Sequence, residues 1–151
     1  TNQAAGTDVT PAAVNNAVNP SMAWSWAGGR KFAKIEVTNA TWAAPTFNVH
    51  LGSTGCSGAS PANGQVDTCA SPNRVPVVFE TFNPASQKIA VDVKSLLQGV
   101  DVTQNTTGTS TGCMSFVGDP ECPGVFDRLG LDYATGAVTT TPQALFKVVS
   151  K

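Results

Sequence analysis

The sequence has few charged residues, because Asp, Glu, Lys and Arg together make up 13% of its 151 positions, about half of the usual share. Nine basic residues against ten acidic ones give a formal net charge of −1, and no basic run is present. A nucleic-acid backbone would find no positive surface here, which excludes nucleic-acid binding. Apolar runs are far shorter than the roughly 20 residues of a membrane-spanning helix, so we expect no membrane span.

Groups that could carry catalysis are also scarce. His50 is the only histidine, and the cysteines occur in pairs that favour disulfides, so no Ser–His or Cys–His pair is expected. The ten acids are scattered, and we interpret Asp119 and Glu121 as turn and helix N-terminal charges rather than an acid–base pair. No glycine-rich phosphate-binding motif is present. The sequence therefore predicts a protein that is not an enzyme.

Cysteine is present in an even number, at positions 56, 69, 113 and 122, in two local pairs among turn-forming residues. Three connectivities are possible, and we expect the local one, Cys56–Cys69 and Cys113–Cys122. The spacing does not match the tight knuckles of a four-thiolate zinc site. Persistent disulfides require an oxidising compartment, so the sequence predicts a periplasmic, cell-surface or extracellular protein.

The length fits a single domain, which we place at residues 21–151 after an extended N-terminal arm of small polar residues over 1–20. Helical spacing between Pro123 and Gly130 predicts one short helix, and a short turn is expected near Leu96. Apolar side chains alternate with polar ones in several segments, and in one of them Ile89 and Val91 are expected to face inward. The strands predicted in this way cover residues 31–37, 46–51, 75–82, 87–93 and 144–149. Short strands, long loops and no crossover helices indicate an all-β fold, an antiparallel β-sandwich.

Tryptophan and histidine form the most unusual cluster of the sequence. Trp24, Trp26 and Trp42 all precede His50, which alternation places on the face of its strand opposite Phe47, Val49 and Leu51. Two interpretations are open: tryptophans that close the core beside a hydrogen-bonded histidine, or a metal site. One imidazole alone makes no tight copper or zinc site, so a metal site needs more ligands, such as Met22, Met114, a modified side chain or a second chain.

Four segments of the sequence resemble, in the same order, the C-terminal half of the MbnP-like family. This family is a group of four-cysteine "metallo-mystery pair" proteins that includes the methanobactin-operon periplasmic protein. It is related to copper-repressible and surface copper proteins of methanotrophs. The resemblance spans about residues 11–149, and its four segments are NPSMAWSWAGGRKFAKIEV, FNVHLGSTGC, QKIAVDVKSLL and GCMSFVGDPECPGVFDRLGLD.

The resemblance implies an exported, mainly β protein that is encoded beside a dihaem enzyme of the cytochrome c peroxidase/MauG type. That partner oxidises a tryptophan to kynurenine, and some members bind copper through histidines and the kynurenine. In this sequence His50 corresponds to the candidate imidazole ligand, Trp24 and Trp26 to the candidate modified residues, and Trp42 to a weaker candidate. The resemblance thus predicts a copper-binding or copper-handling protein that is not itself an enzyme.

The sequence departs from the family in two respects. The N-terminal half of longer members is absent, so an apolar face or edge is expected to be covered by a second polypeptide or by self-association. Asn16 stands where relatives often have a histidine, which would lower copper affinity. Both departures favour the alternative function, a structural protein of the cell surface or of an extracellular filament that binds no metal.

Overall fold

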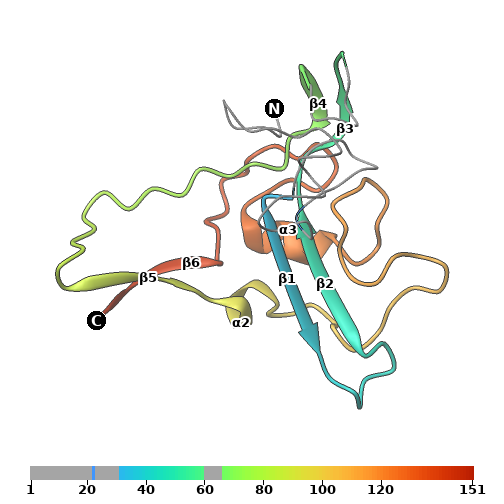
Figure 1. Cartoon of the computed structure of the whole chain (residues 1–151), viewed down its shortest axis with the longest axis horizontal. Coiled ribbons are helices and arrows are strands. Elements are labelled where there is room, and N and C mark those ends of the chain that lie inside the picture. Colours follow the sequence, from blue (N-terminus) through green and yellow to red (C-terminus); the bar gives the residue numbers. More distant parts are fainter. Residues whose placement is uncertain (1–21, 23–30, 60–65) are drawn as a thin grey trace.

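The computed structural model describes residues 22, 31–59 and 66–151, which form three two-stranded antiparallel sheets and two short helices (Figure 1). The predicted arm over residues 1–20 lies outside this part of the chain. The prediction of an all-β fold with antiparallel pairing is confirmed, although the described strands are not joined into the two larger sheets of a sandwich. The elements are β1 (Ala33–Thr38), β2 (Thr46–Leu51), β3 (Thr54–Ser57), β4 (Thr68–Ser71), β5 (Gln87–Val91), α2 (Val93–Leu96), α3 (Pro123–Leu129) and β6 (Phe146–Ser150).

Both helices form where local signals predict them. Pro123 begins α3, because its fixed φ suits the first helical turn, and Gly130 ends it in the left-handed conformation at a φ of 71°. Asp92 caps α2 by accepting a hydrogen bond from the backbone N–H of Ser95 at 3.0 Å. In the described part of the chain, no helix has the length and apolar character needed to cross a membrane.

The predicted disulfides are present, and each closes a local loop. Cys56 and Cys69 face each other in the register of β3 and β4, a hairpin that the sequence analysis missed because it treated this stretch as a loop. The Cys113–Cys122 disulfide lies in the core, with both residues at most 1% exposed. It joins the loop beside β2 to the start of α3, and this connection helps to position the candidate site described below.

The hydrophobic core lies between one face of β2 and the two helices. Phe47 and Val49 of β2 are buried together with Leu96 of α2 and with Val125 and Phe126 of α3. The side chains of β2 alternate, so this buried row leaves the intervening residues of the strand on the opposite face. The core therefore fixes the position of β2 without using that second face.

Two expectations about the middle of the chain are wrong. Residues 75–82 form no strand, because no described strand lies beside them and Pro76 lacks the N–H that a ladder needs. Ile89 and Val91 do not face inward but are 49% and 57% exposed, because β5 pairs only with β6 and no described layer covers that side of the pair. Alternation identifies a strand, but a neighbouring layer decides which of its faces is buried.

Candidate functional site

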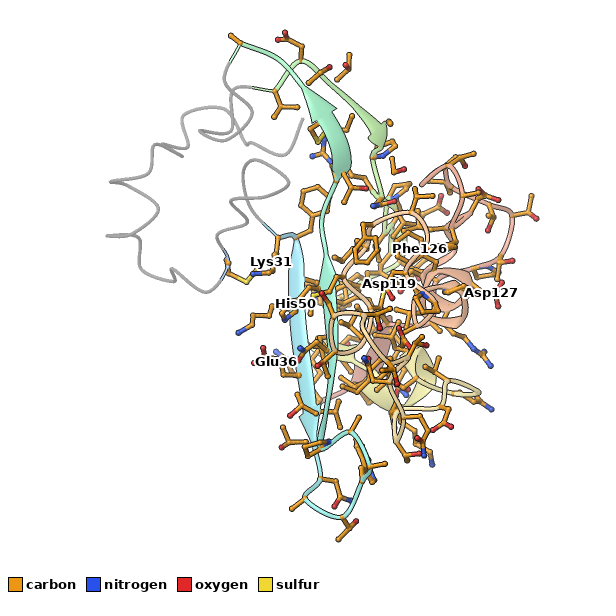
Figure 2. The ribbon with its side chains drawn as sticks, turned by 90° about the vertical axis from the view of Figure 1, so that its right-hand side faces the viewer. Lys31, Glu36, His50, Asp119, Phe126 and Asp127 are labelled. Atoms are coloured by element: carbon orange, nitrogen blue, oxygen red, sulfur yellow. A yellow bond between two sulfur atoms is a disulfide. The ribbon has the colours of Figure 1, made fainter. Side chains whose placement is uncertain are left out.

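The hairpin of β1 and β2 determines the surroundings of His50. In its register Lys34 lies opposite His50 and Glu36 lies opposite Asn48. Cross-strand neighbours project to the same side of a sheet, so these four side chains share the face that points away from the core. Figure 2 shows His50 and Glu36 on one side of the ribbon and Phe126 on the other.

His50 is held by an interaction with Glu36. Its Nε2 atom lies 3.3 Å from Oε1 of Glu36, and the same carboxylate oxygen accepts a hydrogen bond from Nζ of Lys34 at 3.0 Å. The histidine is only 9% exposed, so the ring is largely removed from water. A carboxylate only accepts hydrogen bonds, and therefore Nε2 carries the proton and Nδ1 keeps its lone pair when the ring is neutral.

Burial and the two neighbouring lysines favour this neutral form. Burial lowers the pKa of His50, the positive charges of Lys31 and Lys34 lower it further, and the hydrogen bond to Glu36 opposes them. The pKa of Glu36 is itself lowered, chiefly by the hydrogen bond from Lys34, so the carboxylate stays ionised. A neutral imidazole beside an ionised carboxylate is the state in which histidine binds a metal ion.

The main chain of His50 is attached to the second disulfide loop. Its N–H donates to the carbonyl of Cys113 at 2.9 Å, and its carbonyl accepts a hydrogen bond from the hydroxyl of Ser115 at 2.7 Å. The N–H of Cys113 in turn donates to the carbonyl of Asn48 at 2.8 Å. Met114 belongs to this loop, and its backbone N–H donates to the buried carboxylate of Asp119. The histidine therefore lies on a strand that is hydrogen-bonded along both edges, to β1 on one side and to the second disulfide loop on the other.

Asn48 is a further residue of this face that the sequence analysis did not single out. Its Oδ1 atom is buried and has no hydrogen-bond partner in the described part of the chain. A buried carbonyl oxygen without a donor is costly, so this atom is available to a donor or to a cation. Asn48, Glu36 and Lys34 could have been found by pairing the two alternating segments as a hairpin, which brings all three beside His50.

The predicted tryptophans differ in how the structure relates them to His50. Trp24 and Trp26 lie outside the described residues, but the chain enters and leaves their segment at Met22 and Lys31, where the N–H of Lys31 donates to the Met22 carbonyl at 2.8 Å. Trp42 belongs to the turn between β1 and β2, at the opposite end of the hairpin from His50, and packs partly against the core. The structure therefore does not bring Trp42 and His50 together.

The described residues supply only part of the ligand set of a metal site. His50 offers a single imidazole nitrogen, and Asn48 offers an amide oxygen. Among the described residues no group of three or more His, Cys, Asp or Glu side chains could hold a metal ion. Further ligands would have to come from other parts of the chain or from a partner.

Together these features define a class: a mainly β protein with two local disulfides and a single, nearly buried imidazole on a strand face. The sequence profile of the family described as MbnP matches residues 1–115. The fold is also similar to the solved structure of MbnP from Methylosinus trichosporium, with a TM-score of 0.75 and 36% sequence identity over 87% of this chain. The chain belongs to the MbnP family, and the resemblance stated from the sequence is confirmed.

The similarity to the solved MbnP extends over 50% of that protein's chain, so this chain spans about half of its length. None of the functionally curated proteins matches the chain. The two disulfides indicate an oxidising compartment, which agrees with export.

Proposed function

We propose that this protein is an exported copper-binding or copper-handling protein, not itself an enzyme, in which His50 supplies an imidazole ligand. The observation that supports it most is the contact between Nε2 of His50 and the Glu36 carboxylate at 3.3 Å. A carboxylate on one ring nitrogen orients the imidazole and makes the other nitrogen a stronger ligand. Nδ1 of His50 is then the nitrogen that binds copper, with Oδ1 of Asn48 as a nearby oxygen ligand.

Membership in the MbnP family links the protein to the copper-related methanobactin systems of its relatives. By that resemblance, a dihaem enzyme of the cytochrome c peroxidase/MauG type oxidises Trp24 or Trp26 to kynurenine, with peroxide as the oxidant and the lost ring carbon released as formate. The product carries an amine and carbonyl groups, which turn an apolar side chain into a ligand. The modified side chain would thus bind copper together with His50.

Chain connectivity supports Trp24 and Trp26 over Trp42. Trp24 follows Met22 by only two residues in the sequence. Met22 is hydrogen-bonded to Lys31, whose charge acts on His50. Trp42, in contrast, lies beyond the start of β2, and the stretch of β2 from Thr46 to His50 alone spans roughly 13 Å. We therefore assign the modified residue to the segment between Met22 and Lys31. The two disulfides support a periplasmic, extracellular or cell-surface location.

The test is copper stoichiometry together with intact mass. The native protein should carry near-stoichiometric copper and a tryptophan heavier by about 4 Da in the peptide with Trp24 and Trp26. His50→Ala should lose the copper and keep its fold, because the side chain lies away from the core. Thr46→Ala is the matched control, on the same face of β2 but at its other end. Unchanged copper in the histidine variant would show that the ligand assignment is wrong.

A structural protein of the cell surface or of an extracellular filament, without metal, is the second candidate. The exposed side chains of Ile89 and Val91 favour it, because a contiguous apolar surface suits assembly. This function predicts particles much larger than 15.5 kDa by light scattering, persisting after chelation of metal. A monodisperse monomer with bound copper would exclude it.

A further inference from the structure

The sequence contains a single Asp–Pro peptide bond, between Asp119 and Pro120. The bond lies in the loop that the Cys113–Cys122 disulfide closes, at a turn where the N–H of Cys122 donates to the carbonyl of Asp119 at 3.2 Å. A proline nitrogen carries three carbon substituents and no hydrogen, so it leaves as an amine more readily than an ordinary amide nitrogen. This bond is therefore the easiest one in the loop to break.

The side chain of Asp119 is buried beside this bond. The residue is 0% exposed, and Figure 2 shows it on the same side of β1 and β2 as Phe126. Its Oδ2 atom accepts a hydrogen bond from the N–H of Met114 at 2.8 Å, and its Oδ1 atom accepts one from the N–H of Glu121 at 3.1 Å. The second hydrogen bond reaches two residues ahead, so it folds the carboxyl group forward over the Asp119–Pro120 bond. Copper binding gives this buried acid no role.

The surroundings of Asp119 favour the protonated carboxyl group. Burial raises the pKa of Asp119 and the Glu121 carboxylate adds to this rise, while the N–H groups of Met114 and Glu121 oppose it. Tyr133 is the other titratable group that faces Asp119, and its own pKa is raised, chiefly by burial, so its hydroxyl keeps its proton. A neutral carboxyl group carries the proton that a departing amine requires.

Two donors point at the main-chain carbonyl oxygen of Asp119. The hydroxyl of Tyr133 lies 2.7 Å from this oxygen, and the N–H of Cys122 lies on it as well. Tyr133 is held in place by Phe126, whose ring it meets edge to face at 5.2 Å between centroids, and its hydroxyl also lies 2.9 Å from the carbonyl of Phe116. Fixed donors at such distances stabilise the negative charge that develops on a carbonyl oxygen when a nucleophile attacks its carbon.

We propose that this chain cleaves its own Asp119–Pro120 bond at mildly acidic pH. A carboxyl oxygen of Asp119 attacks the main-chain carbonyl carbon of the same residue, and a C–O bond forms to give a cyclic anhydride. The C–N bond to Pro120 breaks, and the carboxyl proton passes to the proline nitrogen, which leaves as a secondary amine. Water then opens the anhydride to two carboxyl groups, the Asp119 side chain and a new C-terminus. Gly118 and Pro120 are exposed, so water reaches the bond.

The two products stay attached to each other. Cys113 belongs to the fragment that ends at Asp119, and Cys122 belongs to the fragment that begins at Pro120, so their disulfide joins the fragments. The second fragment also keeps α3 in the core. Cleavage would therefore become visible only after reduction and unfolding. It is a single event on the chain itself and does not depend on copper binding.

The test is incubation of the purified, disulfide-bonded chain between about pH 4 and pH 7, the range in which a carboxyl group of raised pKa titrates. The unreduced mass should rise by one water molecule, and reduction should release a chain whose N-terminal residue is Pro120. The rate should increase as pH falls. The reduced chain unfolded in urea at the same pH should cleave about 100-fold more slowly, because it lacks both donors at the carbonyl oxygen.

Three variants separate this chemistry from ordinary acid hydrolysis. Tyr133→Phe keeps the ring that packs on Phe126 and removes only the hydroxyl, so it should fold and cleave about 100-fold more slowly. Asp119→Asn should lose cleavage, because it removes the attacking acid. Asp101→Asn is the matched control, since Asp101 also accepts the N–H two residues ahead, at 3.0 Å, but is exposed and precedes a valine. It should cleave as the unchanged chain does.

Three results would overturn the proposal. They are the absence of a Pro120 N-terminus over this pH range, equal cleavage rates in the folded and the urea-unfolded chain, and an unchanged rate in the folded Tyr133→Phe variant. The first would show that the buried carboxyl group does not attack the bond. The other two would show that the fold does not promote the cleavage.

Discussion

Replacing Gly112 by alanine should separate the second disulfide loop from β2. Gly112 has a φ of +70°, and a Cβ built on it would lie 2.3 Å from both the backbone nitrogen and the oxygen of Asn48. These are main-chain atoms of β2, so they cannot rotate away as a side chain would. The loop must move instead, although its N–H and C=O at Cys113 bond to Asn48 and His50.

The magnitude follows from these two effects. A left-handed alanine costs about 1–2 kcal/mol. Weakening the two hydrogen bonds between Cys113 and β2 costs about 1 kcal/mol each. We therefore expect Gly112→Ala to lower the free energy of unfolding by about 3–4 kcal/mol, a large fraction of the stability of a small domain.

Gly108 provides the matched control, because its φ is +86° but nothing lies within 4 Å of a Cβ built there. Gly108→Ala should cost only the conformational part, about 1–2 kcal/mol. Urea unfolding with the disulfides intact measures both variants, and their m-values should stay unchanged. If the two variants differed by less than about 0.5 kcal/mol, within the error of the extrapolation, the close approach of Gly112 to β2 would not matter for stability and the reasoning would be refuted.

Two further predictions concern the disulfides and pH. Replacing both cysteines of either disulfide by serine should lower the free energy of unfolding by about 2.5–3 kcal/mol through chain entropy. The Cys113→Ser/Cys122→Ser variant should lose at least about 1–2 kcal/mol more. Its sulfurs lie in the core, and Cys122 Sγ accepts a hydrogen bond from the N–H of Ser115 at 3.3 Å. Equal urea midpoints for the two double variants would contradict this. Burial lowers the pKa of His50, with Glu36, Lys34 and Lys31 as its charged neighbours, so the unfolded chain binds the proton more readily. Stability should be complete above about pH 6.5 and fall as pH decreases through that value, and His50→Gln should remove this slope in unfolding curves measured between about pH 5 and pH 8.

Local signals in the sequence were sufficient for the elements that carry them. Alternation identified β2 and β5, and the proline and glycine at the two ends identified α3, because these effects act within a few neighbouring residues. The hairpin of β3 and β4 has hardly any apolar side chains, and its pairing is stabilised by the disulfide between Cys56 and Cys69. No periodicity could have revealed it.

Burial and the site depend on partners that a sequence does not place. The exposure of Ile89 reflects the absence of a layer over the β5–β6 pair among the described residues, and that absence is a feature of tertiary packing and not of the strand itself. His50 could be singled out because it is the only histidine. Its contact with Glu36 depends on the register of β1 and β2, and that register is set by the turn between them.

The two faces of β2 separate stability from chemistry. Phe47 and Val49 are at most 2% exposed and hold the strand against the helices, so substitutions there would create cavities. Asn48 and His50 project to the other face, where they lie opposite Glu36 and Lys34 of β1 and where His50 contacts Glu36. Because the strand period is two, residues on this face can change without repacking the interior. A member of the family could therefore gain or lose a ligand on β2 while keeping its fold, and for this reason fold similarity alone does not establish copper binding.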